Sequence, residues 1–472
     1  MIQLSLAEVA AAIGGQLIDA VDGDLLVTGS VETDSRLIKP GALFFAKPGE
    51  VTDGHNFVGS AAEAGAVAAV VEHEVTDGKA ATLPQIVVAD SVVALGLLAR
   101  NVLERVRRDG DIRVIGITGS NGKTTTKNML RAVLSTQGPT VAPQESFNNE
   151  VGAPISVLKI DRDTRYLVAE LGAGGVGSVA YLARLFQPDV AVELKVGMAH
   201  AGEFGGIDTT AAIKAELLHH CAPNALAVLN ADDGYVRTMA EDFQGEKVWF
   251  GTSTDAPYRA ENLGVSLAGT GFDLHWPEGD KTRVTLRILG EHHVMNALAS
   301  IAVADRLGVP REAIIGALEE LPLAERWRME LSERTDGITV INDAYNASPD
   351  STRAALQTLA QLGRQTGRRT VAIIGEMAEL GKYSVEEHDA LGRLAVRLNL
   401  DRLVAVGNGA KQVHMGACLE GSYNGESQFF ESITEAESAI RGMLEPGDIV
   451  LVKSSKSANL RHLGDRLLEV TA

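Results

Sequence analysis

Cysteine is scarce in this sequence, and basic residues are outnumbered by acidic ones. The 472 residues include two cysteines, Cys221 and Cys418, which lie far apart. They make neither a disulfide framework nor a pair of metal ligands, so we expect two packed thiols in a reducing compartment. The formal net charge of −19 argues against the basic surface that nucleic-acid-binding proteins normally carry. We therefore expect no nucleic-acid partner.

Long hydrophobic runs are also missing. No apolar run approaches the roughly 20 residues that a membrane-spanning helix needs, and residues 1–18 lack the basic region of a secretion signal. The protein is therefore predicted to be cytoplasmic, without membrane insertion. Its length suggests about three domains of roughly 150 residues each. Its 45% hydrophobic content is enough for several cores, and nothing indicates an obligate interface, so a monomer is expected.

The sequence does contain a phosphate-loop pattern at 112–129, IRVIGITGSNGKTTTKNM. Its β-branched residues predict a buried strand, which glycines interrupt before a helix that starts at Lys123. Backbone N–H groups at such a helix start can surround a nucleotide phosphate. Lys123 would reach the outer phosphates, and Thr124 would offer its hydroxyl to Mg²⁺. The usual loop has its first glycine where this chain has Ile117, so an ordinary strand–helix turn is the alternative. The predicted ATP-binding residues of the loop are Gly119, Ser120, Asn121, Gly122, Lys123, Thr124 and Thr125.

Three segments, 1–110, 111–322 and 323–472, differ in pattern, and together they predict an α/β protein of three domains. The first combines short strands with a helix over 92–107. The second alternates strands and helices, which predicts a mostly parallel sheet, with antiparallel hairpins over 258–289 and a helix over 294–307. The third predicts a doubly wound, Rossmann-like unit with helices over 351–362 and 434–443. Thr434 and Glu437 form a capping-box pattern, and 321–323 is a candidate hinge.

Four residues of the second segment could carry chemistry. Glu170 and His200 each follow a strand-like run. Ligands collect at the carboxyl ends of parallel strands, so both could hold Mg²⁺; a solvated glutamate and a structural histidine are the alternatives. Lys214 lies on a predicted helix, where spacing alone indicates a solvent-exposed side chain. Asn296, near a helix start, could contact adenine or cap the helix.

Further candidates lie in the third and first segments. Arg328 could clamp a transferring phosphoryl group when the domains close. Asp343 ends the strand-like run ITVIND and could bind a ribose hydroxyl. A surface arginine and a turn are the alternatives. In the first segment, the short loops around Ser35, Arg36 and Lys47 could receive a phosphorylated ligand, or they are ordinary loops.

Together these residues resemble the Mur ligases, the ATP-dependent amide-forming enzymes of peptidoglycan precursor synthesis. The resemblance covers the whole chain in the family's three-domain order: a UDP-sugar precursor-binding domain, a central ATP-binding domain and a C-terminal ligase domain. Within the family, the strings NDAYNASPDS and GEMAELG most resemble those of the enzymes that add D-alanyl-D-alanine to UDP-N-acetylmuramoyl-tripeptide. The strings that carry the resemblance are TDSRLIKPGALFFAKPG, ITGSNGKTTTKNM, SFNNEVGAPISVL, AELGAG, VGMAHAGEFG, AAIKAEL, GEHHVMNALAS, RWRME, NDAYNASPDS, IIGEMAELG and VLVKSSKS.

The resemblance implies roles for the candidate residues. Thr124 and Glu170 would hold a first Mg²⁺, and His200 a second. Lys214 matches a family lysine often found as a carbamate, an anion that can help to position the second metal. The implied catalytic residues are Lys123, His200, Lys214 and Arg328. The other implied contacts are Asn296 at adenine, Arg328 at the γ-phosphate, Asp343 and Asn346 at the nucleotide face, and Ser35, Arg36, Lys47, Asn148 and Asn149 near the UDP-sugar.

Some positions depart from the family pattern. Gly174 and Gly175 stand where many relatives carry Asn-His, His293 replaces a commoner asparagine, and Lys195 is unusual before VGMAH. They affect the expected contacts and not the reaction class. Other hypotheses are a ligase that adds a single amino acid, a folylpolyglutamate-type synthase, which lacks the first segment, and a P-loop switch protein that would hydrolyse ATP slowly and need a protein partner.

Overall fold

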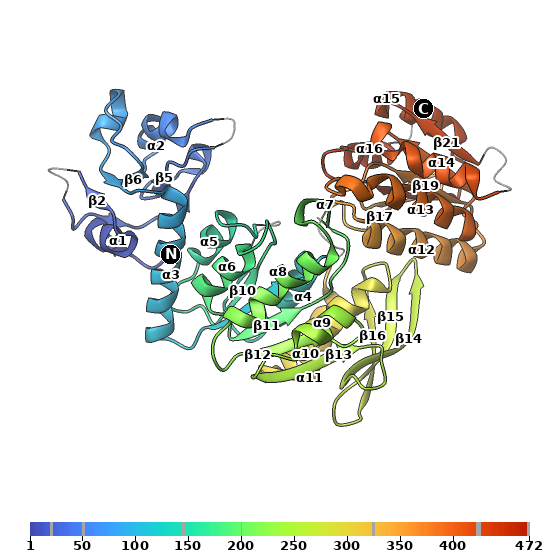
Figure 1. Ribbon diagram of the computed structural model, residues 1–472, viewed down its shortest axis with the longest axis horizontal. Helices are drawn as coiled ribbons and strands as arrows, with labels where there is room; N and C mark the ends of the chain where they lie inside the picture. Colours follow the sequence, from blue (N-terminus) through green and yellow to red (C-terminus); the bar gives the residue numbers. More distant parts are fainter. Residues whose placement is uncertain are drawn as a thin grey trace.

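The computed structural model describes residues 1–18, 22–49, 52–143, 147–199, 201–322, 326–421 and 426–469. Figure 1 shows three α/β units, coloured blue, green to yellow, and orange to red, with the central unit between the other two. This confirms the predicted fold class. The units follow the three predicted segments, although the boundaries at 110 and 322 stay predictions. No helix among these residues is long and apolar enough to cross a membrane.

The N-terminal unit is built on a small sheet in the order β2-β7-β6-β5-β4, in which only the β2–β7 pair is antiparallel. Asp90 caps helix α3 by accepting hydrogen bonds from the backbone N–H groups of Val92 and Val93. Helix α3 packs against α1 on one side and α5 and α6 of the central unit on the other, so it joins the two units. The elements are β1 (Leu4–Ser5), α1 (Leu6–Ile13), β2 (Gln16–Leu17), β3 (Leu26–Val27), β4 (Val31–Glu32), η1 (Ser35–Leu37), β5 (Leu43–Phe45), η2 (Gly54–Phe57), α2 (Val58–Glu63), β6 (Ala68–Val71), η3 (Gly78–Thr82), β7 (Gln85–Val87) and α3 (Ser91–Asp109).

The central unit has a nine-stranded sheet, β16-β15-β14-β13-β12-β11-β8-β10-β9, which is parallel from β9 to β14 and antiparallel from β14 to β16. Consecutive strand residues such as Val114 and Ile115 are both fully buried, in cores on opposite faces of the sheet. Helices therefore cover both faces, which explains the continuous apolar runs in the sequence. The strands are β8 (Arg113–Thr118), β9 (Thr140–Val141), β10 (Tyr166–Glu170), β11 (Val190–Glu193), β12 (Leu226–Asn230), β13 (Glu246–Gly251), β14 (Tyr258–Ser266), β15 (Gly269–His275) and β16 (Lys281–Leu286). The helices are α4 (Lys123–Ser135), α5 (Gly152–Val157), α6 (Ser178–Phe186), α7 (Ala201–Phe204), α8 (Ile207–His220), α9 (Gly234–Met239), α10 (His292–Arg306) and α11 (Arg311–Glu320).

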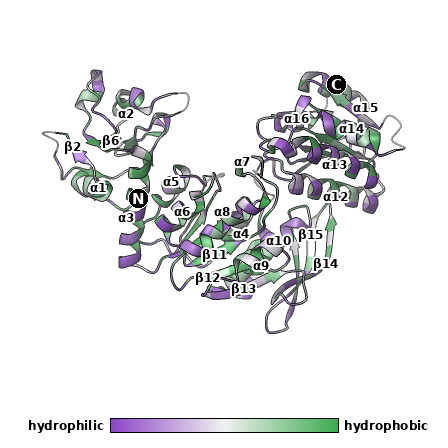
Figure 2. Cartoon of the chain, viewed as in Figure 1, coloured by the Kyte–Doolittle hydropathy of each residue, from purple (hydrophilic) through white to green (hydrophobic). Residues whose placement is uncertain are grey.

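The C-terminal unit has a six-stranded sheet, β17-β18-β22-β19-β20-β21, parallel except for the β17–β18 pair. Figure 2 shows hydrophilic residues gathered on the outer turns of its helices, such as α12 and α13. Strands β17 and β21 were not expected from the sequence, because each is short and lies at a sheet edge. The elements are β17 (Glu330–Glu333), β18 (Thr339–Asn342), α12 (Pro349–Thr366), β19 (Thr370–Ile374), η4 (Gly381–Tyr383), α13 (Ser384–Arg397), β20 (Arg402–Val406), η5 (Asn408–Ala410), α14 (Lys411–Leu419), β21 (Ser427–Phe430), α15 (Ile433–Met443), β22 (Ile449–Lys453) and α16 (Arg461–Arg466).

Two local predictions for this unit are wrong. Helix α15 begins one residue before Thr434, and its cap is Ser432, whose hydroxyl accepts from the Glu435 N–H at 3.2 Å. Glu437 instead accepts hydrogen bonds from Arg441 and Arg466. The second wrong prediction is that both cysteines are packed. Cys418, on α14, is exposed to solvent, whereas Cys221 is partly buried.

Buried His388 on α13 uses both ring nitrogens in the C-terminal unit. Nε2 accepts from the Met377 N–H at 2.9 Å, and Nδ1–H donates to the Ser384 carbonyl at 2.7 Å. Burial lowers the pKa of His388, and a proton on Nε2 would also face the Met377 N–H, another donor.

This pattern predicts acid-sensitive stability. An unfolded histidine gains its proton near pH 6.5. The unfolded state therefore binds more protons than the folded state below that pH, and the free energy of unfolding falls as pH drops through 6.5. We expect denaturant unfolding at pH 7.5 and 5.5 to show a larger loss for the wild type than for His388→Asn. Equal losses in both proteins would contradict this role.

Candidate active site

The phosphate loop lies between β8 and α4, as the sequence predicts. Gly119 and Gly122 have φ angles of 151° and 90°, which side chains disfavour. A Cβ on Gly122 would lie 2.2 Å from Oδ1 of Asn296. Asn296 therefore packs under the loop in the second turn of α10. It does not cap that helix, whose first turn has no side-chain cap, so the capping alternative is wrong.

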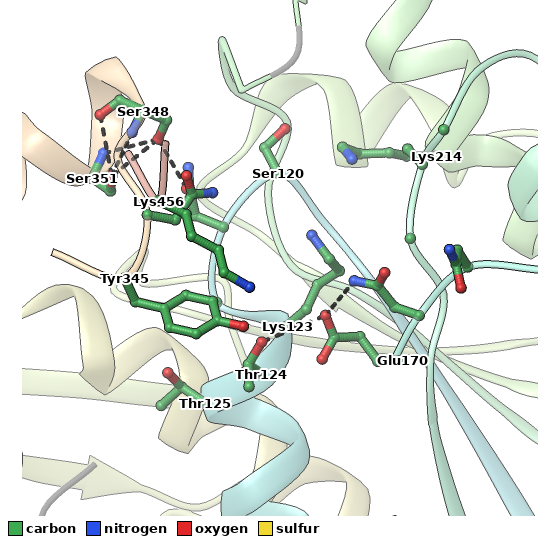
Figure 3. A pocket seen from close by; sticks show the side chains of 18 of the residues that line it. Ser120, Lys123, Thr124, Thr125, Glu170, Lys214, Tyr345, Ser348, Ser351 and Lys456 are labelled. Atoms are coloured by element: carbon green, nitrogen blue, oxygen red, sulfur yellow. Dashed lines mark hydrogen bonds between the residues drawn. The ribbon is translucent and has the colours of Figure 1, made fainter. Parts of the chain in front are cut away.

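Lys123, Thr124 and Glu170 meet just beyond the loop (Figure 3). Lys123 Nζ donates to the Gly119 carbonyl at 2.7 Å. Thr124 Oγ1 lies 3.5 Å from Oε1 of Glu170, which also accepts from the Asn148 amide at 2.8 Å. Glu170 is buried, and its Oε2 has no hydrogen-bond partner among the described residues. A carboxylate oxygen and a threonine hydroxyl are oxygen ligands of the kind that Mg²⁺ prefers.

Lys214 faces the same region from α8. The prediction from spacing alone, a solvent-exposed lysine, is wrong: Lys214 is 3% exposed, because α8 packs against β8 and β11. Burial, together with the nearby positive charge of Lys123, lowers the pKa of Lys214 to about 7, whereas Glu193 opposes the shift. Glu193 is also buried, which raises the pKa of its carboxyl group. Lys214 thus has a substantial unprotonated fraction near neutral pH.

The C-terminal unit supplies a second set of side chains. Arg328 Nη2 donates to Thr124 Oγ1 at 3.4 Å, and its guanidinium lies 4.3 Å from the ring centre of Tyr345. Asp343 forms an ion pair with Lys453 at 2.6 Å, and Lys453 also donates to the Asn346 carbonyl at 2.9 Å. Asp343 therefore neutralises the charge of a buried lysine.

A cavity of about 710 Å³ joins these groups. It also reaches Asp90, Val92 and Val93 at the start of α3, and Tyr181 on α6. It therefore spans from the C-terminal unit to the helix that carries the N-terminal unit. The predicted site residues that line it are Ser120, Asn121, Gly122, Lys123, Thr124, Thr125, Asn148, Asn149, Glu170, Lys214, Asn296, Arg328, Asp343 and Asn346.

Other predicted residues lie elsewhere. Ser35, Arg36 and Lys47 do not line the cavity; Arg36 is exposed and pairs with Asp34 at 2.6 Å. Their role at a UDP-sugar stays a prediction. His200 lies outside the described residues. In the part of the chain that the structure describes, no group of three or more His, Cys, Asp or Glu side chains has metal-binding geometry.

Sequence reasoning missed several cavity residues. Tyr345, Lys453 and Lys456 line it, and Lys453 ends strand β22, where the sheet-edge argument used for Glu170 applies equally. His293, which departs from the family pattern, is also in the lining. Burial holds the pKa of His293 well below its usual value, and its Nε2 has no partner among the described residues. A neutral imidazole is therefore present at the edge of the cavity.

Fold and site define a three-domain P-loop protein with a ligand-sized cavity that draws groups from the central and C-terminal units. Models of the Mur ligase family match three ranges: "Mur ligase family, catalytic domain" over 28–102, "Mur ligase middle domain" over 117–304, and "Mur ligase, glutamate ligase domain" over 327–456. The chain belongs to the Mur ligase family.

Named relatives match over nearly the full length. The UDP-N-acetylmuramoyl-tripeptide–D-alanyl-D-alanine ligase of Mycobacterium tuberculosis is 40% identical, over 99% of this chain and 98% of the relative. The ligase of the same name from Escherichia coli is 32% identical, over 96% and 98%. Among solved structures, MurF from Acinetobacter baumannii superposes with a TM-score of 0.89 at 32% identity, over 99% of each chain. MurF from Thermotoga maritima, in complex with ADP, gives 0.80 at 26% identity, over 94% and 97%.

Proposed function

We propose that this protein is an ATP-dependent ligase that joins D-alanyl-D-alanine to UDP-N-acetylmuramoyl-tripeptide, in cytoplasmic peptidoglycan precursor synthesis. The proposal is supported by full-length relatives of that name. Within the structure, one observation carries it: Arg328 of the C-terminal unit reaches Thr124 of the phosphate loop at 3.4 Å. A cation from one domain beside the phosphate loop of another can stabilise the charge that develops during phosphoryl transfer.

The chemistry needs an activated carboxylate. An oxygen of the tripeptide carboxylate attacks the γ-phosphorus of ATP, the bond from that phosphorus to the bridging oxygen breaks, and ADP leaves. The amine of D-alanyl-D-alanine then attacks the acyl phosphate carbon and loses a proton. The carbon–oxygen bond breaks, and phosphate leaves with formation of the amide. Lys123 and Arg328 bind the moving phosphoryl group and neutralise its charge.

The residues beside the phosphate loop fit a divalent cation. We propose that Thr124 and Glu170 hold one Mg²⁺, because Oε1 of Glu170 lies 3.5 Å from the Thr124 hydroxyl and its buried Oε2 has no hydrogen-bond partner among the described residues. His200 and Lys214 are the proposed ligands of a second. Bound Mg²⁺ supplies positive charge that stabilises the transferring phosphate. With a pKa of about 7, Lys214 has the free amine that carbon dioxide requires to form the predicted carbamate.

The other substrate contacts are also proposals. Asn296, Asp343 and Asn346 are proposed to bind the nucleotide. Asn148, which donates to Glu170, and Asn149, which accepts from the Gly152 N–H at the start of α5, line the cavity and are proposed to contact the UDP-linked peptide. We propose that this substrate extends to Ser35, Arg36 and Lys47 in the N-terminal unit. Closure of the C-terminal unit over the phosphate loop would exclude water from the acyl phosphate.

Phosphate release tests this function. Purified protein receives ATP, Mg²⁺ and UDP-N-acetylmuramoyl-tripeptide, with either D-alanyl-D-alanine or D-alanine. A parallel reaction contains the shorter dipeptide precursor with meso-diaminopimelate. Release that depends on D-alanyl-D-alanine, with a product heavier by one dipeptide, supports the proposal. Release only with a single amino acid would assign a sibling ligase, and release without any acceptor would indicate a nucleotide hydrolase.

A further inference from the structure

The first turn of α12, in the C-terminal unit, rests on the segment that follows β11 in the central unit. Asp350 Oδ2 accepts a hydrogen bond from the Met198 N–H at 3.2 Å. Its Oδ1 lies 3.5 Å from Nζ of Lys195. A Cβ on Gly197 would lie 2.3 Å from Oδ2. The segment 195–198 therefore forms a seat for this carboxylate, which a side chain at position 197 would block.

The seat is tied directly to the phosphate loop. Ser120 N–H donates to the Lys195 carbonyl at 2.7 Å. The Ser120 hydroxyl donates to the Gly197 carbonyl at 3.1 Å and accepts from the Gly197 N–H at 2.9 Å. Ser348, the cap of α12, donates to Oδ1 of Asn121 at 3.0 Å. Each residue of the central unit that contacts Asp350 is thus itself bonded to the loop or next to a residue that is.

Arg328 depends on the same docking, since it belongs to the C-terminal unit and reaches Thr124 across the cavity. We propose that Asp350, seated on Lys195, Gly197 and Met198, is a positioning residue that holds the C-terminal unit against the phosphate loop and so places Arg328. The catalytic consequence rests on the proposed function; the docking role does not. Arg353, 3.7 Å from Asp350 on the same helix, offers the carboxylate another partner when the units separate.

The two contacts differ in expected strength. A hydrogen bond from a backbone N–H to a carboxylate is worth more than a half-exposed ion pair. The Lys195 side chain is 48% exposed, compared with 20% for Asp350. Asp350→Ala should therefore lower kcat and raise the KM for ATP by roughly ten-fold in total, and Lys195→Met by about two- to five-fold. The double variant, Asp350→Ala with Lys195→Met, should have the same kcat and KM as Asp350→Ala alone.

Domain separation is measured independently of activity. Spin labels at Asp242 of the central unit and Val385 of the C-terminal unit, both exposed, report the distance distribution after Cys221 and Cys418 are changed to serine. Asp350→Ala should broaden this distribution toward longer distances, without substrates and with an ATP analogue. Lys79→Met, which removes an exposed ion pair with Glu63 in the N-terminal unit, is the matched control and should leave it unchanged.

The outcomes separate the two claims. A wild-type distance distribution in Asp350→Ala, with kcat and KM within two-fold of wild type, overturns the positioning role. If that variant fails to fold, Gly197→Ala, whose Cβ would lie 2.3 Å from Oδ2 of Asp350 and block its contact with segment 195–198, replaces it under the same criteria. A broadened distribution in a protein whose wild type shows no dipeptide-dependent phosphate release would support the docking role while refuting the proposed function.

Discussion

Replacement of Lys123 by alanine is expected to lower dipeptide-dependent phosphate release by roughly 10²–10³-fold or more. The ammonium lies at the phosphate loop, where it donates to the Gly119 carbonyl at 2.7 Å, and it shares the cavity with Lys214 and Arg328. The other lysines that line the cavity come from elsewhere, Lys214 from α8 and Lys453 and Lys456 from the C-terminal unit, so none of the three occupies the start of α4. Phosphate release with all three substrates measures the loss.

The fold should survive this change. Burial lowers the pKa of Lys123, which means that the folded protein pays a cost to keep this charge, and alanine removes that cost. We expect the free energy of unfolding to change by about 1 kcal/mol or less, measured by denaturant titration. Lys159→Ala, at an exposed position, is the matched control and should keep full activity. Turnover near the wild-type level in Lys123→Ala would refute the assignment of the phosphate loop.

The phosphate loop could be predicted from sequence because it is local. Strand, glycines and helix start occupy one continuous segment, and the positive φ angles of Gly119 and Gly122 are conformations that glycine makes possible. Glu170 was also predictable, because β10 pairs in parallel with β8 and both strands end at the same edge of the sheet. The rule that parallel strands end at the same edge of a sheet was therefore enough to predict that Thr124 and Glu170 lie close together.

Long-range partners could not be read in the same way. Asp343 pairs with Lys453, 110 residues later, because β18 and β22 are neighbours in the sheet, and strand order is not encoded in periodicity. The burial of Lys214 beside Glu193 depends on how α8 packs, so helical spacing alone gave the wrong environment. Only the family resemblance indicated that Lys214 belongs to the site.

The docking of the C-terminal unit was beyond sequence reasoning for a different reason. From the sequence, Lys195 could be identified only as an unusual residue before VGMAH, and the neighbouring sequence does not indicate that Asp350 is its partner. Their contact, like that of Ser348 with Asn121, exists only when two separately folded units meet. Such contacts have no local pattern, because each unit would form its own core without them.

Replacement of Arg328 by alanine is expected to lower kcat on the order of 10³-fold, with a smaller change in the KM for ATP. Arg328 is the residue by which the C-terminal unit reaches Thr124, and its guanidinium stacks on Tyr345 at 4.3 Å. Charge on the transferring phosphoryl group grows in the transition state, so the loss falls mainly on kcat. Steady-state kinetics at saturating dipeptide separates the two constants.

Arg326 provides a matched control two residues away. It pairs with Asp465 at 3.0 Å, and its side chain is 65% exposed, so Arg326→Ala should stay within about two-fold of wild type. Arg328→Lys should recover little, because lysine keeps the charge but lacks the planar group that stacks on Tyr345 and donates in a fixed direction. If Arg328→Lys retained most of the activity, Arg328 would act as a simple point charge. If Arg328→Ala did so, the C-terminal unit would contribute no cation to the reaction, and the proposed domain-spanning site would be wrong.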